Sequence, residues 1–201
     1  MKKLRLSVLV AASGLAGVML LAGCAKQEQS AAVTAPVLAA KLPVGLTPEA
    51  SVLDMMLEVI DPNADELWES VATISTRTGV EERHPRTDAE WKAVRRKALL
   101  LVEGANLLVV EGRPVAHPGQ KLEETGEGDL TPEQAQLEID KDRASFVSFA
   151  GALQTASRKM LGAIDKRDTE MFLEAGGELD EACEACHTRF WYPNAPKPPG
   201  L

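Results

Sequence analysis

The sequence predicts an all-α protein built as a four-helix bundle. Four long segments carry apolar residues at the three- and four-residue spacing of amphipathic helices, and three of them open with a capping signal. No segment alternates with the two-residue period of a half-buried strand, and the chain contains no Asn-Gly hairpin turn. Four amphipathic helices with three connections close most simply as a bundle around one core.

The first helix is expected to begin at Thr47, which a proline follows, and to run toward Thr78. The Asp61-Pro62 step should kink this helix or divide it in two, because proline lacks the N–H that an internal helical turn requires. The longest apolar seam of the segment consists of Leu53, Met56, Ile60, Ala64, Leu67, Val71 and Ile74.

Three more helices are expected after it. Capping boxes begin at Thr87 and Thr131 and mark the starts of two of them. Residues 112–130 are rich in glycine and proline and form a long crossover, either a surface excursion or a loop that contacts a partner. The expected helical ranges are about 87–112, 131–165 and 168–192.

The N-terminus resembles the signal peptide of a bacterial lipoprotein. A basic start precedes the apolar residues 6–23, and Leu21-Ala22-Gly23-Cys24 resembles the lipobox, in which the cysteine receives a lipid and becomes the first residue of the mature chain. We therefore expect removal of residues 1–23 and a lipid on Cys24, which would anchor the protein to a bacterial membrane on its periplasmic side. An uncleaved membrane anchor is the alternative, since the apolar run approaches the length of a span.

The rest of the chain divides into three parts. Residues 24–46 have no clear period and few large apolar side chains, which predicts a flexible tether. A single domain is expected over 47–192, followed by a Pro-rich tail over 193–201.

The net charge of the chain argues against anionic partners. Loss of residues 1–23 removes three basic residues of 22 and leaves 19 against 30 acidic ones, a formal charge of −11. This balance argues against nucleic acid and against electrostatic binding to anionic lipid. It favours a partner with a basic docking face, although an acidic excess is also what an ordinary solvated surface carries.

The motif that points to function is Cys183-Glu184-Ala185-Cys186-His187. This C-x-x-C-H run predicts covalent attachment of one haem c. On a helix Cys183, Cys186 and His187 share one face, so the thiols can form thioethers while the imidazole reaches the iron. The cysteines continue an apolar seam, which should place the haem inside the bundle. That seam contains Phe172, Gly176, Leu179 and Phe190.

Other uses of the motif have less support. A structural zinc site shows no obvious fourth ligand, and a thioredoxin-like dithiol would need a βαβ context. His84 and His117 each precede a proline and are expected in turns. The chain shows no nucleophile–base constellation and no phosphate-binding loop, so we expect no enzymatic activity.

A capped four-helix bundle with C-x-x-C-H near the end of its last helix resembles the class II c-type cytochromes, over roughly residues 47–192. The resemblance implies that Cys183 and Cys186 hold the haem and that His187 is the proximal iron ligand. It also places the distal face of the haem against the first helix, where Met56 lies on the apolar seam and would be the distal ligand. Met55 lies off that seam. The chain departs from the family in its tether, long crossover, Pro62 and Phe190-Trp191-Tyr192 ending.

Within this family the distal residue decides the function. A methionine at that place implies a six-coordinate electron carrier, which is the function we expect, with a redox protein of the periplasm or membrane as partner. A non-ligating residue implies a five-coordinate protein that binds gases such as NO or CO. A third alternative is a non-catalytic assembly subunit of a membrane electron-transport complex, and a homodimer is left open.

Overall fold

The computed structural model describes residues 47–122 and 125–196, which belong to one compact unit of the chain. Helices make up most of these residues and one short hairpin supplies the strands, which confirms the all-α class. None of the described helices is both long and apolar enough to cross a membrane. The expected signal peptide, Cys24 and the tether lie outside the described residues, as do residues 197–201 of the tail.

The first helical arm consists of α1 (Val52–Met55), the π-helical turn η1 (Met56–Ile60) and α2 (Asp61–Ser70). Its N-cap is Ser51, not Thr47 as the sequence predicted. The Ser51 hydroxyl accepts from the Asp54 N–H at 3.0 Å, and the Asp54 carboxylate accepts from the Ser51 N–H at 2.8 Å. This reciprocal pair satisfies two free N–H groups, which Thr47 does not do.

Pro62 neither ends nor separates the first arm. It lies in the first turn of α2, directly after η1, and the Asp61 N–H bonds to the Met56 carbonyl five residues earlier. A π-helical turn contains one more residue than an α-helical turn. The arm therefore changes its helical geometry before the proline and continues past it.

The arm ends at Ser70 instead of reaching Thr78. The chain then forms a hairpin in which β1 (Ala72–Thr76) pairs antiparallel with β2 (Gly79–Arg83). The stretch is rich in β-branched residues, which lose side-chain freedom in a helix and favour strands. Gly79 closes the turn with a φ of +146°, a conformation that L side chains rarely adopt. The expectation of helix over residues 71–78 is therefore wrong.

The remaining helices are α3 (Asp88–Leu108), α4 (Pro132–Lys141), α5 (Arg143–Lys166) and α6 (Thr169–Phe190). The predicted capping boxes at Thr87 and Thr131 are both present, and Asp168 caps α6. The third predicted helix is divided, because Asp142 leaves helical geometry at φ −135° and ψ 55° and caps α5 through the Ser145 N–H.

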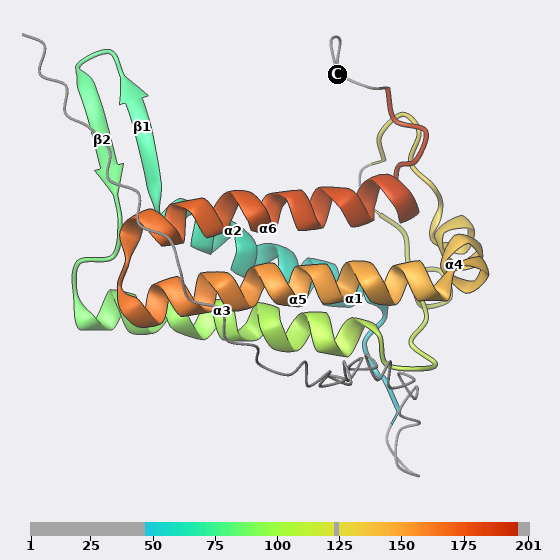
Figure 1. Cartoon of the computed structure of the whole chain (residues 1–201). Helices are drawn as coiled ribbons and strands as arrows, with labels where there is room; N and C mark the ends of the chain where they lie inside the picture. Colours follow the sequence, from blue (N-terminus) through green and yellow to red (C-terminus); the bar gives the residue numbers. More distant parts are fainter. Residues whose placement is uncertain (1–46, 123–124, 197–201) are drawn as a thin grey trace, which may run out of the picture. The chain divides into compact units, whose positions relative to one another are not determined.

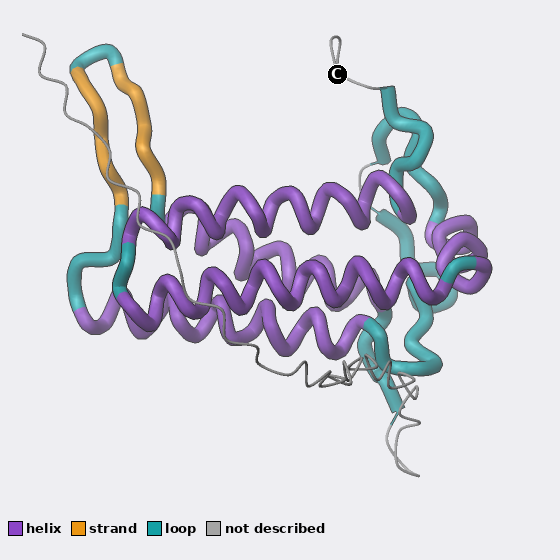
Figure 2. Tube along the Cα trace, viewed as in Figure 1, coloured by secondary structure: helices purple, strands orange, loops and turns teal. Residues whose placement is uncertain are grey.

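The long helices lie side by side. The helix α5 packs between α3 and α6, while η1 and α2 pack against α3, and α2 also touches α6 (Figures 1 and 2). The most deeply buried apolar side chains come from four of these elements, and each is 0 % exposed. They are Leu67, Ala98, Leu101, Met160, Ala163, Phe172 and Leu179.

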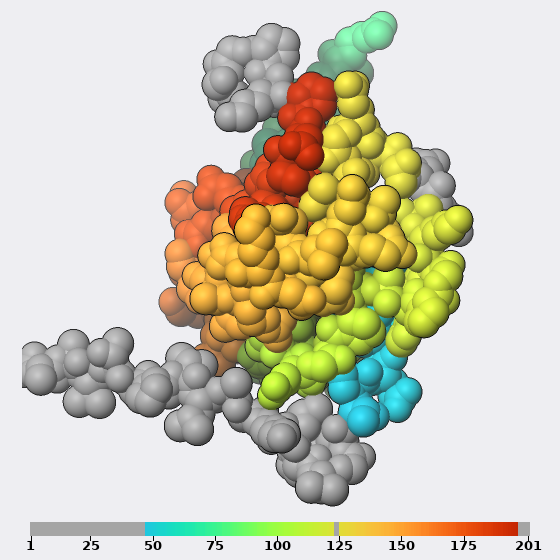
Figure 3. Space-filling model, turned by 90° about the vertical axis from the view of Figure 1, so that its right-hand side faces the viewer, coloured from blue at the N-terminus to red at the C-terminus, as the bar shows by residue number. Residues whose placement is uncertain are grey.

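The helix α4 and the crossover lie at one end of the long helices. Figure 3 looks onto this end, where α4, the crossover and the last described residues lie together. The Leu130 N–H donates to the Trp191 carbonyl at 2.7 Å. The C-terminal segment and the crossover are therefore joined at the end of α6 that carries the C-x-x-C-H motif.

Candidate functional site

The last turns of α6 bring the predicted attachment residues to one cavity. Cys183, Cys186 and His187 all line a cavity of about 310 Å³. Each of the three is partly buried, as expected for side chains on the inward edge of a helix face. The spacing of 3 and 4 residues in the sequence thus produces the shared face that the motif requires.

The cavity is lined by residues from every helical element that the structure describes. Its wall is formed mainly by apolar side chains, which favour a ligand with a large apolar surface. The apolar wall residues of α1, η1 and α2 are Val52, Leu53, Met56, Leu57, Ile60, Ala64 and Trp68. Those of α3, α4 and α5 are Leu108, Pro132, Ala135, Ile139, Phe146, Phe149, Ala150 and Leu153.

The two neighbouring methionines have different surroundings. Met56 begins η1 and lines the cavity together with His187. Met55 is only 4 % exposed and belongs to the hydrophobic core, but it is not among the residues that line the cavity. The structure therefore brings Met56, and not Met55, to the cavity that contains the predicted proximal histidine.

Both cysteines of the motif are free thiols, and their raised pKa values keep them protonated at neutral pH. Burial raises the pKa of the Cys183 thiol to about 11. The nearby carboxylates of Asp180, Asp61 and Glu184 add smaller effects in the same direction. Burial also raises the pKa of Cys186 to about 12, and Cys183 adds a smaller effect. Such thiols are poor nucleophiles at neutral pH, which does not suit a dithiol redox catalyst.

His187 is held in the neutral form. Burial lowers its pKa, and this outweighs the opposite effect of the Glu184 and Asp61 carboxylates. Its ring contacts Trp191 edge-to-face, with centroids 5.0 Å apart, and Tyr192 with centroids 5.9 Å apart. A neutral imidazole has the free lone pair that a metal needs, and the two aromatic neighbours restrict how the ring can turn.

Trp191 has a buried hydrogen-bond donor without a partner. It lines the wall, and its buried indole Nε1 has no hydrogen-bond acceptor among the described residues. A buried donor without a partner costs about 1 to 3 kcal/mol. The Phe190-Trp191-Tyr192 ending departs from the family that the chain resembles, but the sequence did not predict that the Trp191 donor would be buried without a partner.

These residues fit a covalently attached haem. The wall is apolar, and two thiols and a neutral imidazole share one face. The described residues contain no cluster of three or more His, Cys, Asp or Glu side chains arranged to hold a metal ion by themselves.

Exposed carboxylates lie on the rim of the cavity. Asp61 of α2 and Asp180 and Glu184 of α6 belong to its lining and are exposed. The Tyr192 hydroxyl donates to Glu184 Oε2 at 2.6 Å. Burial and this hydrogen bond raise the pKa of Tyr192, so the phenol stays protonated and retains its donor. The rim is therefore acidic, in keeping with the charge of the whole chain.

The crossover supplies another part of the cavity wall through Val115 and Leu122. Its backbone is tied to the start of α1, where the Val52 N–H donates to the Pro114 carbonyl at 2.8 Å and the Leu53 N–H to the Val115 carbonyl at 2.9 Å. The crossover therefore satisfies N–H groups that a helix start leaves free. The sequence predicted that residues 112–130 form either a surface excursion or a loop that contacts a partner. It did not predict that this crossover would form part of the cavity wall.

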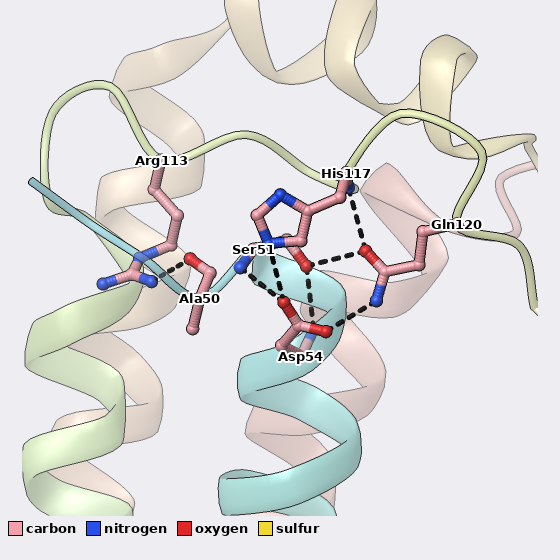
Figure 4. A network of polar contacts seen from close by, with 6 residues as sticks. All are labelled: Ala50, Ser51, Asp54, Arg113, His117 and Gln120. Carbon is pink, nitrogen blue, oxygen red and sulfur yellow. Dashed lines mark hydrogen bonds and ion pairs between the residues drawn. The ribbon is translucent and has the colours of Figure 1, made fainter.

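A polar network fastens the same crossover to Asp54 (Figure 4). Gln120 Nε2 donates to Asp54 Oδ1 at 2.6 Å, and His117 Nε2 lies 3.1 Å from Asp54 Oδ2. Gln120 Oε1 accepts from the His117 N–H at 2.9 Å and from the Ser51 hydroxyl at 3.1 Å. Hydrogen bonds from Ser51, with smaller effects of Gln120 and His117, hold the pKa of Asp54 below its ordinary value. His117, which the sequence predicted only as a turn residue, therefore belongs to the polar network that connects the crossover to Asp54.

Comparison of the chain with models of protein families, with curated proteins and with solved structures finds no match.

The raised thiol pKa values predict slow alkylation of the haem-free protein. At pH 8 Cys183 and Cys186 should react with iodoacetamide at least about tenfold more slowly in the folded chain than in urea, because the thiolate is the reactive form. Ala185→Cys, at an exposed position between them, should react at an ordinary rate. Site-resolved mass spectrometry measures all three. Equal rates in folded and unfolded chains would contradict the burial of the pair.

Proposed function

We propose that this chain is a monohaem c-type cytochrome that carries electrons. The observation that supports this most is that Cys183, Cys186, His187 and Met56 line one apolar cavity. In this proposal η1 with α2, α3, α5 and α6 form a four-helix bundle around one haem c. The resemblance to the class II c-type cytochromes supports the same assignment.

Each of the four residues has a defined part. The Cys183 and Cys186 thiols would hold the haem as thioethers, and the neutral His187 imidazole would be the proximal ligand. The Met56 thioether would be the distal ligand, and as a soft, uncharged donor it would stabilise ferrous iron. The bound haem supplies a one-electron change between ferric and ferrous iron. The electron comes from a reduced redox partner and passes to an oxidised one.

The remaining wall residues keep this site dry and oriented. The apolar side chains of η1, α3 and α5 exclude water, which raises the energy of the more highly charged ferric form. The acidic rim of Asp61, Asp180 and Glu184 is suited to a partner with a basic docking face.

The protein is proposed to work at a membrane. A lipid on Cys24 would hold it on the periplasmic side of a bacterial membrane, with residues 24–46 as the tether. This part of the proposal rests on the lipobox-like Leu21-Ala22-Gly23-Cys24 alone.

Covalent attachment of haem is tested by extraction. Expressed with a cytochrome c maturation system, the protein should gain the mass of one haem and keep it in acid acetone, because thioether bonds survive this treatment. The double variant Cys183→Ala, Cys186→Ala should lose all haem to the solvent, while Cys24→Ser should retain it. A folded wild-type protein without haem, or with fully extractable haem, would overturn the proposal.

Distal ligation by Met56 is tested by two substitutions that remove sulfur but nearly conserve volume. Met56→Leu should produce a five-coordinate, high-spin haem that binds CO readily and has a lower reduction potential, with loss of the weak sulfur-to-iron band. Met55→Leu should leave these spectra unchanged, because Met55 does not line the cavity. If the wild type is already high-spin and Met56→Leu changes nothing, a gas-binding cytochrome replaces the electron carrier.

Lipid anchoring is tested by Cys24→Ser. The change should move the protein from the membrane to the soluble fraction or arrest removal of the signal peptide, because serine offers no thiol for lipid transfer. The N-terminal mass of the mature wild type should correspond to a lipidated Cys24. A mature chain that keeps residues 1–23 would show a membrane anchor instead.

A further inference from the structure

The hairpin of β1 and β2 has no buried face. All five residues of β2 are exposed, with Val80 at 66 %, and only Ala72 and Ile74 of β1 are partly buried. Both strands project sideways from one end of the long helices (Figures 1 and 2), and no helix that the structure describes makes more than marginal contact with them. The hairpin is thus an arm outside the core.

Such an arm requires more than its own pairing to be stable. An isolated two-stranded hairpin is marginal in water, whereas three or more strands make a sheet that can persist. Local bonds at the turn help it form, since the Thr76 hydroxyl donates to the Gly79 carbonyl at 2.8 Å and accepts from the Thr78 N–H at 3.3 Å. They do not occupy the outer edges of the two strands. Each edge can therefore accept another strand.

The two edges differ in charge. The strand β2 ends in Glu81, Glu82 and Arg83, and charges of this kind protect an edge against pairing. The strand β1, Ala-Thr-Ile-Ser-Thr, has no charged residue and carries three β-branched side chains. The edge suited to an added strand is therefore β1.

The sequence of β1 is compatible with a second copy of itself. In an antiparallel pair centred on Ile74, Ala72 lies opposite Thr76 and Thr73 lies opposite Ser75 of the other copy. Ile74 then meets its own counterpart. Opposed hydroxyl and β-branched pairs stabilise a sheet, and no like charges meet in this register.

We propose that two copies of this chain associate through β1, antiparallel about a two-fold axis at Ile74, to form a four-stranded sheet in the order β2–β1–β1–β2. The contact is isologous and closes on itself, so it stops at a dimer. The charged β2 strands become the outer edges and limit further growth. The hairpin lies at the opposite end of the long helices from the C-terminus of α6, so the proposal stands independently of the haem assignment (Figure 1).

Sedimentation equilibrium of the full mature protein in detergent tests this assembly. The wild type should have the mass of a dimer, and Ile74→Lys, which brings two like charges together on the axis, should weaken the dimer at least tenfold. Val80→Lys adds the same charge on the outer strand and should leave the dimer unchanged. Helical circular dichroism of each variant should equal that of the wild type.

A cross-link provides a second measurement that does not depend on weakening the contact. Ile74→Cys should form an intermolecular disulfide under mild oxidation, because opposed residues of a pair lie within reach of such a bond. Val80→Cys should remain monomeric in the same gel. A monomeric wild type, or a dimer that survives Ile74→Lys and gives no Ile74→Cys cross-link, would overturn the proposal. So would a β1 edge that is occupied only by a different protein.

Discussion

The rotation of about 100° per residue along α6 is the constraint on which the site depends. It places Cys183, Cys186 and His187 on the face that already carries the buried Phe172 and Leu179. A cavity lies at the end of the face that carries the motif, while Phe172 toward the other end is fully buried. The first arm contributes Met56 to the cavity wall, and Met56 is the first residue of the π-helical turn η1.

The crossover completes this site by satisfying backbone groups. The start of α1 would expose free N–H groups beside an apolar cavity, where water is a poor substitute. Carbonyls of Pro114 and Val115 accept two of them, and the Asp54 carboxylate is held by Ser51, Gln120 and His117. The wall residues Val115 and Leu122 are fixed as a consequence. The crossover therefore forms part of the cavity wall, because its carbonyl groups accept hydrogen bonds from the free N–H groups at the start of α1.

Local signals in the sequence predicted the elements that depend on local chemistry. The capping boxes at Thr87 and Thr131 and the spacing of the C-x-x-C-H motif required nothing distant. The prediction failed where a competing local signal was passed over. The Ser51 to Asp54 box outweighed Thr47, and Asp142 capped a new helix inside a continuous apolar pattern. The hairpin forms where the chain is rich in β-branched residues, which favour strands, and this segment packs on none of the described helices. The wall formed by the crossover was beyond prediction, because it depends on contacts between segments more than 60 residues apart.

The Phe190-Trp191-Tyr192 ending is one of the features in which this chain departs from the family it resembles. Phe190 packs edge-on against Phe146 and Phe149, the Trp191 carbonyl holds the crossover, and the Tyr192 hydroxyl holds Glu184. Trp191 and Tyr192 also pack against the imidazole ring of His187. The orientation and polarity around a ligating histidine tune the metal it holds. Differences in redox behaviour between this chain and class II c-type cytochromes should therefore originate at the proposed proximal side, even if the distal ligand is the same.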